Sequence, residues 1–100
     1  MPFNHNGATI SARPLTIGDD NEIDLLSFRL NDETDLYNAQ KWAEFMVGAV
    51  VEGDYPLPYV NSKSATEEAR HSYAAWQNLP RGFMQKWKAE LRKADSDPKA

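Results

Sequence analysis

Apolar residues recur at three- and four-residue steps along the stretch from Leu36 to Val51. Two such sets run one position apart, with Leu36, Ala39, Ala43, Met46 and Val50 in the first and Trp42, Phe45 and Ala49 in the second. Together they form an apolar face wider than a surface helix needs, so the pattern predicts a central helix that is contacted on two sides. The helix is expected to stop near Glu52 and Gly53, since glycine suits the position just past a helix end.

Gly48 lies inside this predicted helix, where glycine is about 1 kcal/mol less favourable than alanine. It indicates either a close crossing by another element or an early end to the helix. The polar segment before the helix, Asn31 to Asp35, is typical of a turn, and Asp32 or Thr34 is a candidate helix cap.

The N-terminal segment carries the pair Asn6-Gly7 between Phe3 and the run Ala8 to Ile10. Asn-Gly is the preferred pair for a type I′ turn, because both central residues need a positive φ. The segment therefore predicts a hairpin over residues 2–13, with Phe3 and Ile10 on its buried face. Two strands alone are marginal in water, so the hairpin must lie on the helices or pair with a strand from another copy or partner.

Residues 17–30 allow two interpretations. Thr16 and Asp19 match a capping arrangement, and acidic residues crowd the start, where the helix dipole favours them. One helical face would then hold Ile23, Leu26 and Leu30. Against a helix, apolar residues alternate with polar ones from Leu26 to Leu30, which is strand periodicity. The acidic start and the scarcity of strand-forming residues favour the helix.

The second half of the chain predicts a loop followed by two helices. Two prolines within Tyr55 to Val60 favour an extended loop, with its apolar side chains across the helical core. Ser64 and Glu67 form a capping box for a helix whose apolar face, up to Asn78, holds Ala65, Ala69, Tyr73 and Trp76. Pro80 suits the start of the last helix, from Arg81 to Ala94, whose apolar residues are Phe83, Met84, Trp87 and Leu91.

The predicted fold is mainly α, a small bundle of about four helices with a short N-terminal β-hairpin. Residues 1–94 form a single domain, with the hairpin at 2–13 and the helical part at 16–94, and residues 95–100 form a flexible C-terminal tail. Three tryptophans and an aromatic share of 11% favour a packed core.

The net charge of −4 argues against non-specific nucleic-acid binding by the whole molecule. The absence of cysteine excludes disulfides, thiolate metal sites and a thiol nucleophile. The sequence shows neither a secretory signal nor an apolar run of the roughly 20 residues that a membrane span needs. A cytoplasmic location is therefore expected.

The candidate chemical groups do not form a recognisable reaction site. His71 follows Glu67 and Glu68 at helical spacing, so the three side chains can meet, but the further ligands or partners of a metal or acid–base site are missing. No serine stands in a nucleophile elbow, and the five glycines are scattered rather than gathered in a phosphate-binding loop. His5, beside the hairpin turn, is expected on the surface. These patterns predict a protein that is not an enzyme, with no metal and no cofactor.

Charge is unevenly distributed along the chain. Acidic residues dominate Asp19 to Asp35, and basic residues dominate the last helix at Arg81, Lys86, Lys88, Arg92 and Lys93. Three interpretations remain: solvated faces or an internal attraction between the two segments, head-to-tail contact between copies, and a basic helix that grips an acidic partner.

The order of these features resembles a known family. An opening of the form F-x-H-N-G-x-T precedes an acidic helix, a tryptophan-containing amphipathic helix, a proline-rich loop and a closing helical pair. The residues that carry the resemblance are Phe3, His5, Asn6, Gly7, Thr9, Leu79, Pro80 and Trp87. The chain is similar in this respect to the small tail assembly chaperones of long-tailed bacteriophages.

The resemblance implies a non-enzymatic helical chaperone in the host-cell cytoplasm that binds the tape-measure protein, keeps its apolar helices soluble and helps to recruit tail-tube subunits. It also implies a longer form made by ribosomal frameshifting. The alternatives are a small acidic regulatory or inhibitory phage protein that blocks a host factor, and a minor structural subunit of a virion that forms homo-oligomers through its hairpin.

The expected partner site is an apolar groove for a partner helix, rimmed by basic side chains. The groove candidates are Trp42, Phe45, Met46, Tyr55, Leu57, Tyr59, Trp76, Met84 and Trp87, and the basic candidates are Arg81, Lys88 and Arg92.

Overall fold

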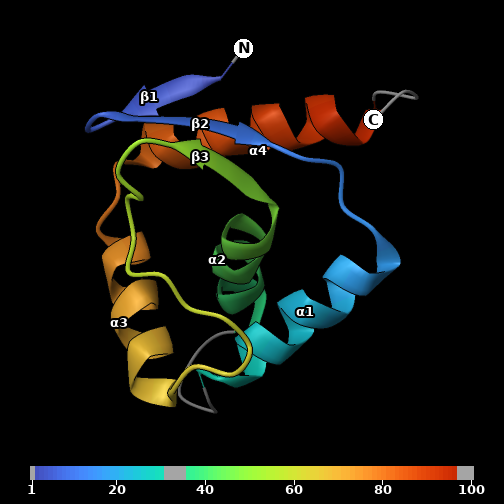
Figure 1. The fold of residues 1–100 in the computed structure, drawn as a ribbon, viewed down its shortest axis with the longest axis vertical. Helices are drawn as coiled ribbons and strands as arrows, with labels where there is room; N and C mark the ends of the chain where they lie inside the picture. The colour runs from blue at the N-terminus through green and yellow to red at the C-terminus, as the bar shows by residue number, and fades with distance from the viewer. Residues whose placement is uncertain (1, 31–35, 97–100) are drawn as a thin grey trace.

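The computed structural model describes residues 2–30 and 36–96, which form four helices and a three-stranded antiparallel sheet (Figure 1). In chain order the elements are β1 (Phe3–His5), β2 (Ala8–Ala12), α1 (Ile17–Phe28), α2 (Leu36–Gly48), β3 (Ala49–Glu52), α3 (Thr66–Gln77) and α4 (Arg81–Ser96). The fold is mainly α with an N-terminal hairpin, as the sequence predicts.

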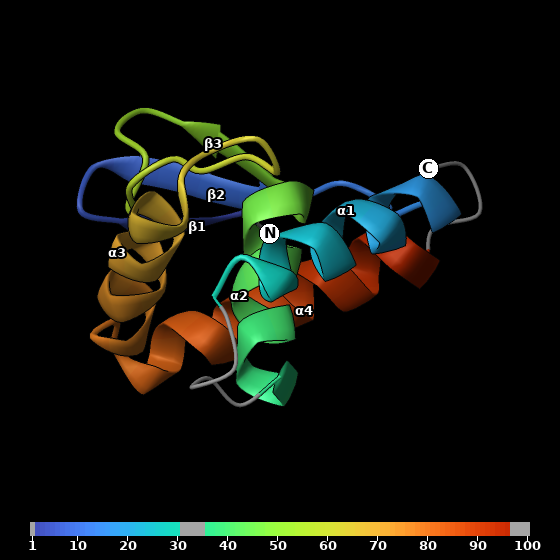
Figure 2. The ribbon, with the colours of Figure 1, turned by 90° about the horizontal axis from the view of Figure 1, so that it is seen from below.

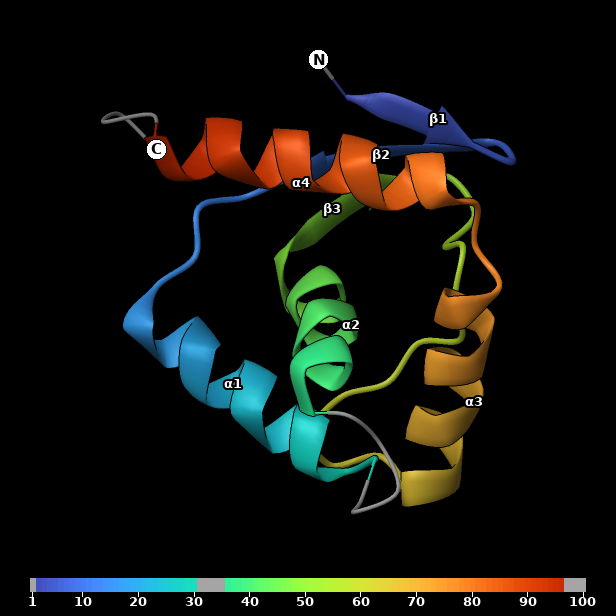
Figure 3. The ribbon, with the colours of Figure 1, turned by 180° about the vertical axis from the view of Figure 1, so that it is seen from behind.

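The helix α2 occupies the centre of the molecule. Figure 2 shows α1 and α3 on opposite sides of α2, and Figure 3 shows α4 running along the sheet at one end of the molecule. The predicted contact of the central helix on two sides is thus confirmed. None of the helices in the described ranges is both long and apolar enough to cross a membrane.

The predicted hairpin is present between β1 and β2. Phe3 pairs with Ile10 in an antiparallel register, and both side chains are buried. Asn6 and Gly7 have φ values of 46° and 91°, as the predicted two-residue turn requires.

A third strand corrects the expected length of the central helix. The prediction that this helix continues to Glu52 is wrong, because α2 ends at Gly48 and Ala49–Glu52 forms β3. The strand pairs with β2, with Val51 opposite Ile10. The β-branched pair Val50-Val51 suits a strand, and a third strand supplies the pairing that a hairpin alone lacks. The partner strand that the hairpin needs therefore comes from the same chain.

Gly48 fulfils both of the roles that its position indicated. It is the last residue of α2, and other elements cross it closely. A Cβ atom at this position would lie 3.1 Å from Cδ2 of Leu15 and 3.4 Å from Cη2 of Trp87. Alanine here would therefore require one of these side chains to move.

Gly53 ends a strand rather than a helix. Its φ is +101°, and a Cβ atom there would lie 2.6 Å from the carbonyl oxygen of Gly7. The turn after β3 thus packs directly against the hairpin turn, at a distance that only glycine permits.

Residues 17–28 are helical, which confirms the favoured of the two interpretations. The Thr16 hydroxyl accepts the N–H of Asp19 at 3.2 Å, and the Asp19 carboxylate accepts the N–H of Thr16 at 2.8 Å. Ile23, Leu26 and Leu30 are buried, as predicted for one helical face. The predicted caps of α2, Asp32 and Thr34, lie outside the described residues.

The capping box predicted at Ser64 is wrong. The helix α3 begins at Thr66, its N-cap Ala65 makes no side-chain bond, and the Ser64 hydroxyl accepts the N–H of Asn61 at 3.1 Å. Because the Ser64 N–H also donates to the Asn61 carbonyl, the serine closes a local turn that competes with capping. The preceding loop follows the prediction, since it is not helical and buries Leu57 and Val60.

The last helix begins directly after Pro80 and buries Phe83, Trp87 and Leu91. It extends to Ser96, two residues beyond the predicted end at Ala94. The Asp95 carboxylate accepts the N–H of Leu15 at 3.3 Å, which connects the end of α4 to the segment before α1. Residues 97–100 lie outside the described ranges.

Substitution by alanine should have opposite effects on stability at Gly53 and at Gly82. Gly53→Ala should lower the free energy of unfolding by about 2 kcal/mol or more, because the new methyl group meets backbone in a strained conformation. Gly82→Ala, in the first turn of α4, meets nothing within 4 Å and should raise stability by about 0.5–1 kcal/mol. Urea unfolding of both variants measures the difference. Equal effects would contradict the close packing of Gly53 against Gly7.

Candidate functional site

Most of the apolar side chains predicted to line a partner groove lie in the hydrophobic core. The buried members of that set are Trp42, Phe45, Met46, Leu57, Trp76 and Trp87. Tyr55 and Met84 are half-buried, and only Tyr59 is largely exposed. The buried side chains present no surface to a partner in this conformation.

Phe45 is the centre of the aromatic core. Its ring lies 5.3 Å from the ring of Trp76, 5.3 Å from that of Phe83 and 5.0 Å from that of Trp87, with the last two contacts edge-to-face. Such pairs contribute about 0.5–1.5 kcal/mol each beyond the burial of their area. The predicted groove residues are therefore brought together, but they contact one another.

Two of the buried indoles differ in their polar contacts. Trp42 donates its Nε1–H to the hydroxyl of Ser72 at 2.9 Å, and both residues are fully buried. The Nε1 of Trp87 has no hydrogen-bond partner among the described residues. An unsatisfied buried donor costs about 1–3 kcal/mol, so the contribution of Trp87 to stability comes from the packing of its ring rather than from its N–H.

The tyrosines of the proline-rich loop differ in exposure. Tyr55 donates its hydroxyl to Sδ of Met46 at 3.6 Å, and burial raises its pKa to about 12. Tyr59 is 68% exposed. It lines an open hollow of about 470 Å³ together with Pro58 and with residues of α3.

Glu67, Glu68 and His71, the trio predicted at helical spacing, all line that hollow. Each of them is exposed. Over residues 2–30 and 36–96, no three His, Cys, Asp or Glu side chains are arranged to hold a metal ion. His5, expected on the surface, is half-buried and packs edge-to-face on Phe83 at 5.0 Å.

The outer face of α1 carries large apolar side chains that do not belong to the core. Ile17 is 84% exposed, Phe28 75% and Leu25 53%. Helical geometry places these three within about 80° of one another around α1, with the exposed Asn21 and Asp24 between Ile17 and the other two, and we call the three apolar residues the α1 stripe. The sequence contained this signal, because a helix that buries Ile23 and Leu26 must direct Leu25 and Phe28 outward. The predicted partner site was drawn from the aromatic helices and did not include these α1 residues.

A polar hollow of about 320 Å³ lies beside the α1 stripe, between α1, α2 and α4, and we call it the acidic hollow. Its charged lining consists of Asp20, Asp24, Lys41, Glu44 and Lys88. Burial raises the pKa of Glu44, and the charge of Lys88 opposes that rise. Lys41 lies 4.1 Å from the centre of the Tyr37 ring, at the edge of the hollow.

The basic side chains predicted for a partner lie on α4. Their spacing of seven and four residues places Arg81, Lys88 and Arg92 on one side of the helix. Lys88 is half-buried and lines the acidic hollow, whereas Arg81 and Arg92 are exposed. The charge of Lys88 acts on Glu44 of α2, and the other two basic residues remain directed to solvent.

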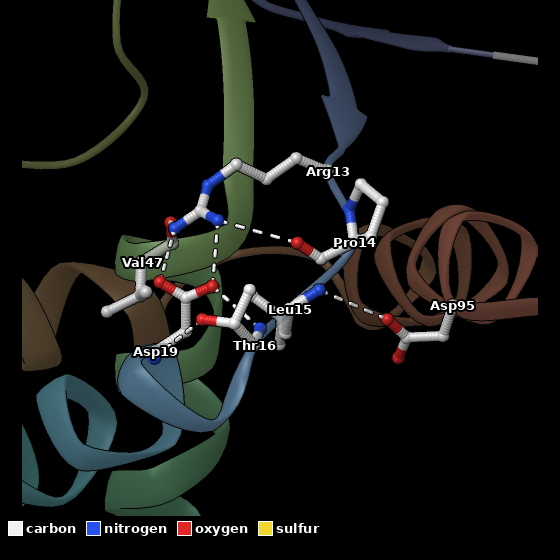
Figure 4. A network of polar contacts seen from close by, with 7 residues as sticks. All are labelled: Arg13, Pro14, Leu15, Thr16, Asp19, Val47 and Asp95. Carbon is white, nitrogen blue, oxygen red and sulfur yellow. Dashed lines mark hydrogen bonds and ion pairs between the residues drawn. The ribbon is translucent and has the colours of Figure 1, made fainter. Parts of the chain in front are cut away.

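Arg13 fixes the position of α1 (Figure 4). Its guanidinium donates to both carboxylate oxygens of Asp19, at 2.8 and 2.9 Å, and to the carbonyl of Val47 at 3.0 Å. Its backbone N–H donates to the carbonyl of Gly48 at 3.0 Å. Hydrogen bonds from Arg13, followed by those from Thr16, hold the pKa of Asp19 well below its usual range. One side chain therefore connects the start of α1 to the end of α2.

Comparison of the chain with protein-family models, with curated proteins and with solved structures gave no match.

The lowered pKa of Asp19 makes a pH-dependent prediction. A carboxyl whose pKa is depressed on folding stabilises the fold above its unfolded pKa of about 3.9, and this contribution is lost as the pH falls below that value. Asp19→Asn should therefore lower the free energy of unfolding at pH 7 by about 1–3 kcal/mol. The difference from the parent protein should shrink between pH 4 and pH 2, in a series of urea titrations.

Asp20→Asn is the matched control, since Asp20 is exposed in the same helical turn. It should change stability by no more than about 0.5 kcal/mol. Equal losses in the two variants would show that the contacts of Asp19 with Arg13 and Thr16 do not hold α1 in place.

Proposed function

We propose that this protein is a non-enzymatic assembly chaperone or adaptor that binds an apolar helical segment of another polypeptide, such as a phage tape-measure protein during tail assembly. The observation that carries the proposal is the α1 stripe. Ile17, Leu25 and Phe28 stay exposed, whereas the three tryptophans and the other three phenylalanines are buried in the core. Burial of each such side chain by a partner would contribute about 1.5–3 kcal/mol.

The end of the stripe offers a contact for a helix. Leu25 and Phe28 are neighbours at i and i+3, and the apolar side chains of a second helix can pack against such a pair. Because Arg13 and the buried residues of α1 hold the helix in place, little ordering would accompany binding. A rigid apolar stripe on an acidic, well-charged domain suits a protein that covers the apolar helix of a partner and keeps it from aggregating.

The order of elements gives separate support. The hairpin built on Asn6-Gly7, the capped acidic helix and the closing pair around Pro80 are the features by which the sequence resembles the tail assembly chaperones. The alternative of a virion subunit assumes that the hairpin pairs with a strand from another copy. The pairing of β2 with β3 within the chain makes this alternative less favoured.

Co-expression with a partner tests the proposal. The partner to use is the tagged product of the longest reading frame beside the coding sequence, which is where a tape-measure protein is expected. The parent protein should co-purify with it, and Leu25→Ser/Phe28→Ser should reduce the co-purified amount at least about tenfold, because two large apolar contacts are lost.

Val50→Thr is the control, since Val50 is an apolar side chain, 43% exposed, on the sheet rather than on α1. It should co-purify as the parent protein does. Failure of the parent protein to co-purify, or unchanged co-purification of the double variant, would remove the proposal.

A further inference from the structure

Carboxylates flank the α1 stripe on both sides. Asp20 and Asp24 lie on the side toward α2, where they line the acidic hollow. Glu22 is exposed, and the helical repeat places it on the opposite side together with Arg29, which is half-buried and donates to the carbonyl of Ser62. The amide nitrogen of Gln40 lies 3.5 Å from Oδ1 of Asp24. This distance is at the long limit of a hydrogen bond, so the Asp24 carboxylate can still accept a bond from a partner. The apolar line and its acidic borders form one half of a helix pair in which flanking charges select the partner.

The lysines and the carboxylates of the hollow differ in exposure. Lys41 and Lys88 are half-buried, with Lys41 over the ring of Tyr37 and Lys88 near Glu44. The carboxylates that border the stripe, Asp20 and Asp24, are both exposed. The charges most accessible beside the stripe are therefore carboxylates, and the hollow has room for the end of a long side chain.

From this charge complementarity we infer that the occupant of the α1 stripe is an amphipathic helix of a different polypeptide whose apolar residues are bordered by lysine or arginine. The inference rests on the proposed function and adds the chemistry of the partner. Basic side chains on one flank reach Asp20 and Asp24 at the mouth of the acidic hollow, and those on the other flank reach Glu22. The charges select the partner, and Leu25 and Phe28 supply most of the affinity.

A second copy of this chain fits the surface less well. Two α1 helices brought together would oppose mostly like charges, because the exposed Asp20, Glu22 and Asp24 outnumber the half-buried Arg29. The basic helix α4 has the right charge, but the large apolar residues of its face, Phe83, Trp87 and Leu91, are buried. Its exposed residues therefore offer charge without an apolar line to pack on the stripe.

Two synthetic helical peptides test the inference. They share the same leucine positions, and lysines border the leucines in one peptide and glutamates in the other. Fluorescence anisotropy at about 0.1 M salt, where screening acts beyond about 10 Å, gives both dissociation constants. The lysine peptide should bind about tenfold more tightly, because three exposed charge pairs each contribute about a factor of two to three.

Asp20→Asn/Asp24→Asn should reduce this preference to about two- to threefold, since one flanking pair remains. Glu67→Gln/Glu68→Gln changes the net charge equally on α3, away from the stripe, and should keep the tenfold preference. An equal loss in both double variants would overturn the inference, because net charge alone would then explain the preference.

The remaining outcomes separate the inference from the proposed function. Equal affinity for the two peptides, with both lost in Phe28→Ser, would overturn the charge selection and leave the stripe as the binding surface. Absence of binding to either peptide, or binding unaffected by Phe28→Ser, would overturn both proposals. A dimer in sedimentation that Phe28→Ser dissociates would assign the stripe to a second copy and overturn the inference alone.

Discussion

The arrangement of this domain depends on the hydrogen bonds of one guanidinium group. Arg13 leaves the sheet at the end of β2 and bonds at once to the carboxylate that caps α1 and to a carbonyl in the last turn of α2. Charge-assisted pairs with two parallel bonds restrict both distance and orientation. These bonds therefore set the angle between α1 and the sheet, and that angle sets the direction in which Leu25 and Phe28 point into solvent.

The aromatic residues have a different role from the one that their number suggested. A domain of 100 residues has little interior, so some of the three tryptophans and other rings were expected to remain partly outside. Here the rings around Phe45 pack against one another in the core, and Ile17, Leu25 and Phe28 of α1 remain exposed. The candidate site therefore lies on the helix with the fewest aromatic residues, and its chemistry is set by apolar contact and carboxylate charge.

Local signals in the sequence predicted most of the fold. The Asn6-Gly7 turn, the Thr16–Asp19 cap and the start of α4 after Pro80 each depend on residues close in the chain, and each is present. The strand β3 was missed because Ala49 and Val50 continue the helical spacing of α2, and only pairing with β2 decides between the two structures. Ser64 failed as a cap for a similar reason, since the turn with Asn61 depends on the path of the preceding loop. For the candidate site, spacing identified apolar residues correctly but could not show which of them the core would absorb.

The placement of the indoles has a practical consequence for spectroscopy. Trp42, Trp76 and Trp87 are all at least nine-tenths buried, and α1 contains no tryptophan. Their emission is therefore that of a shielded chromophore and reports on the integrity of the interior. A ligand seated on α1 would leave this intrinsic signal nearly constant, so an unchanged emission spectrum is compatible with a fully occupied surface. A fluorophore attached to α1 itself would be needed to observe that occupancy directly.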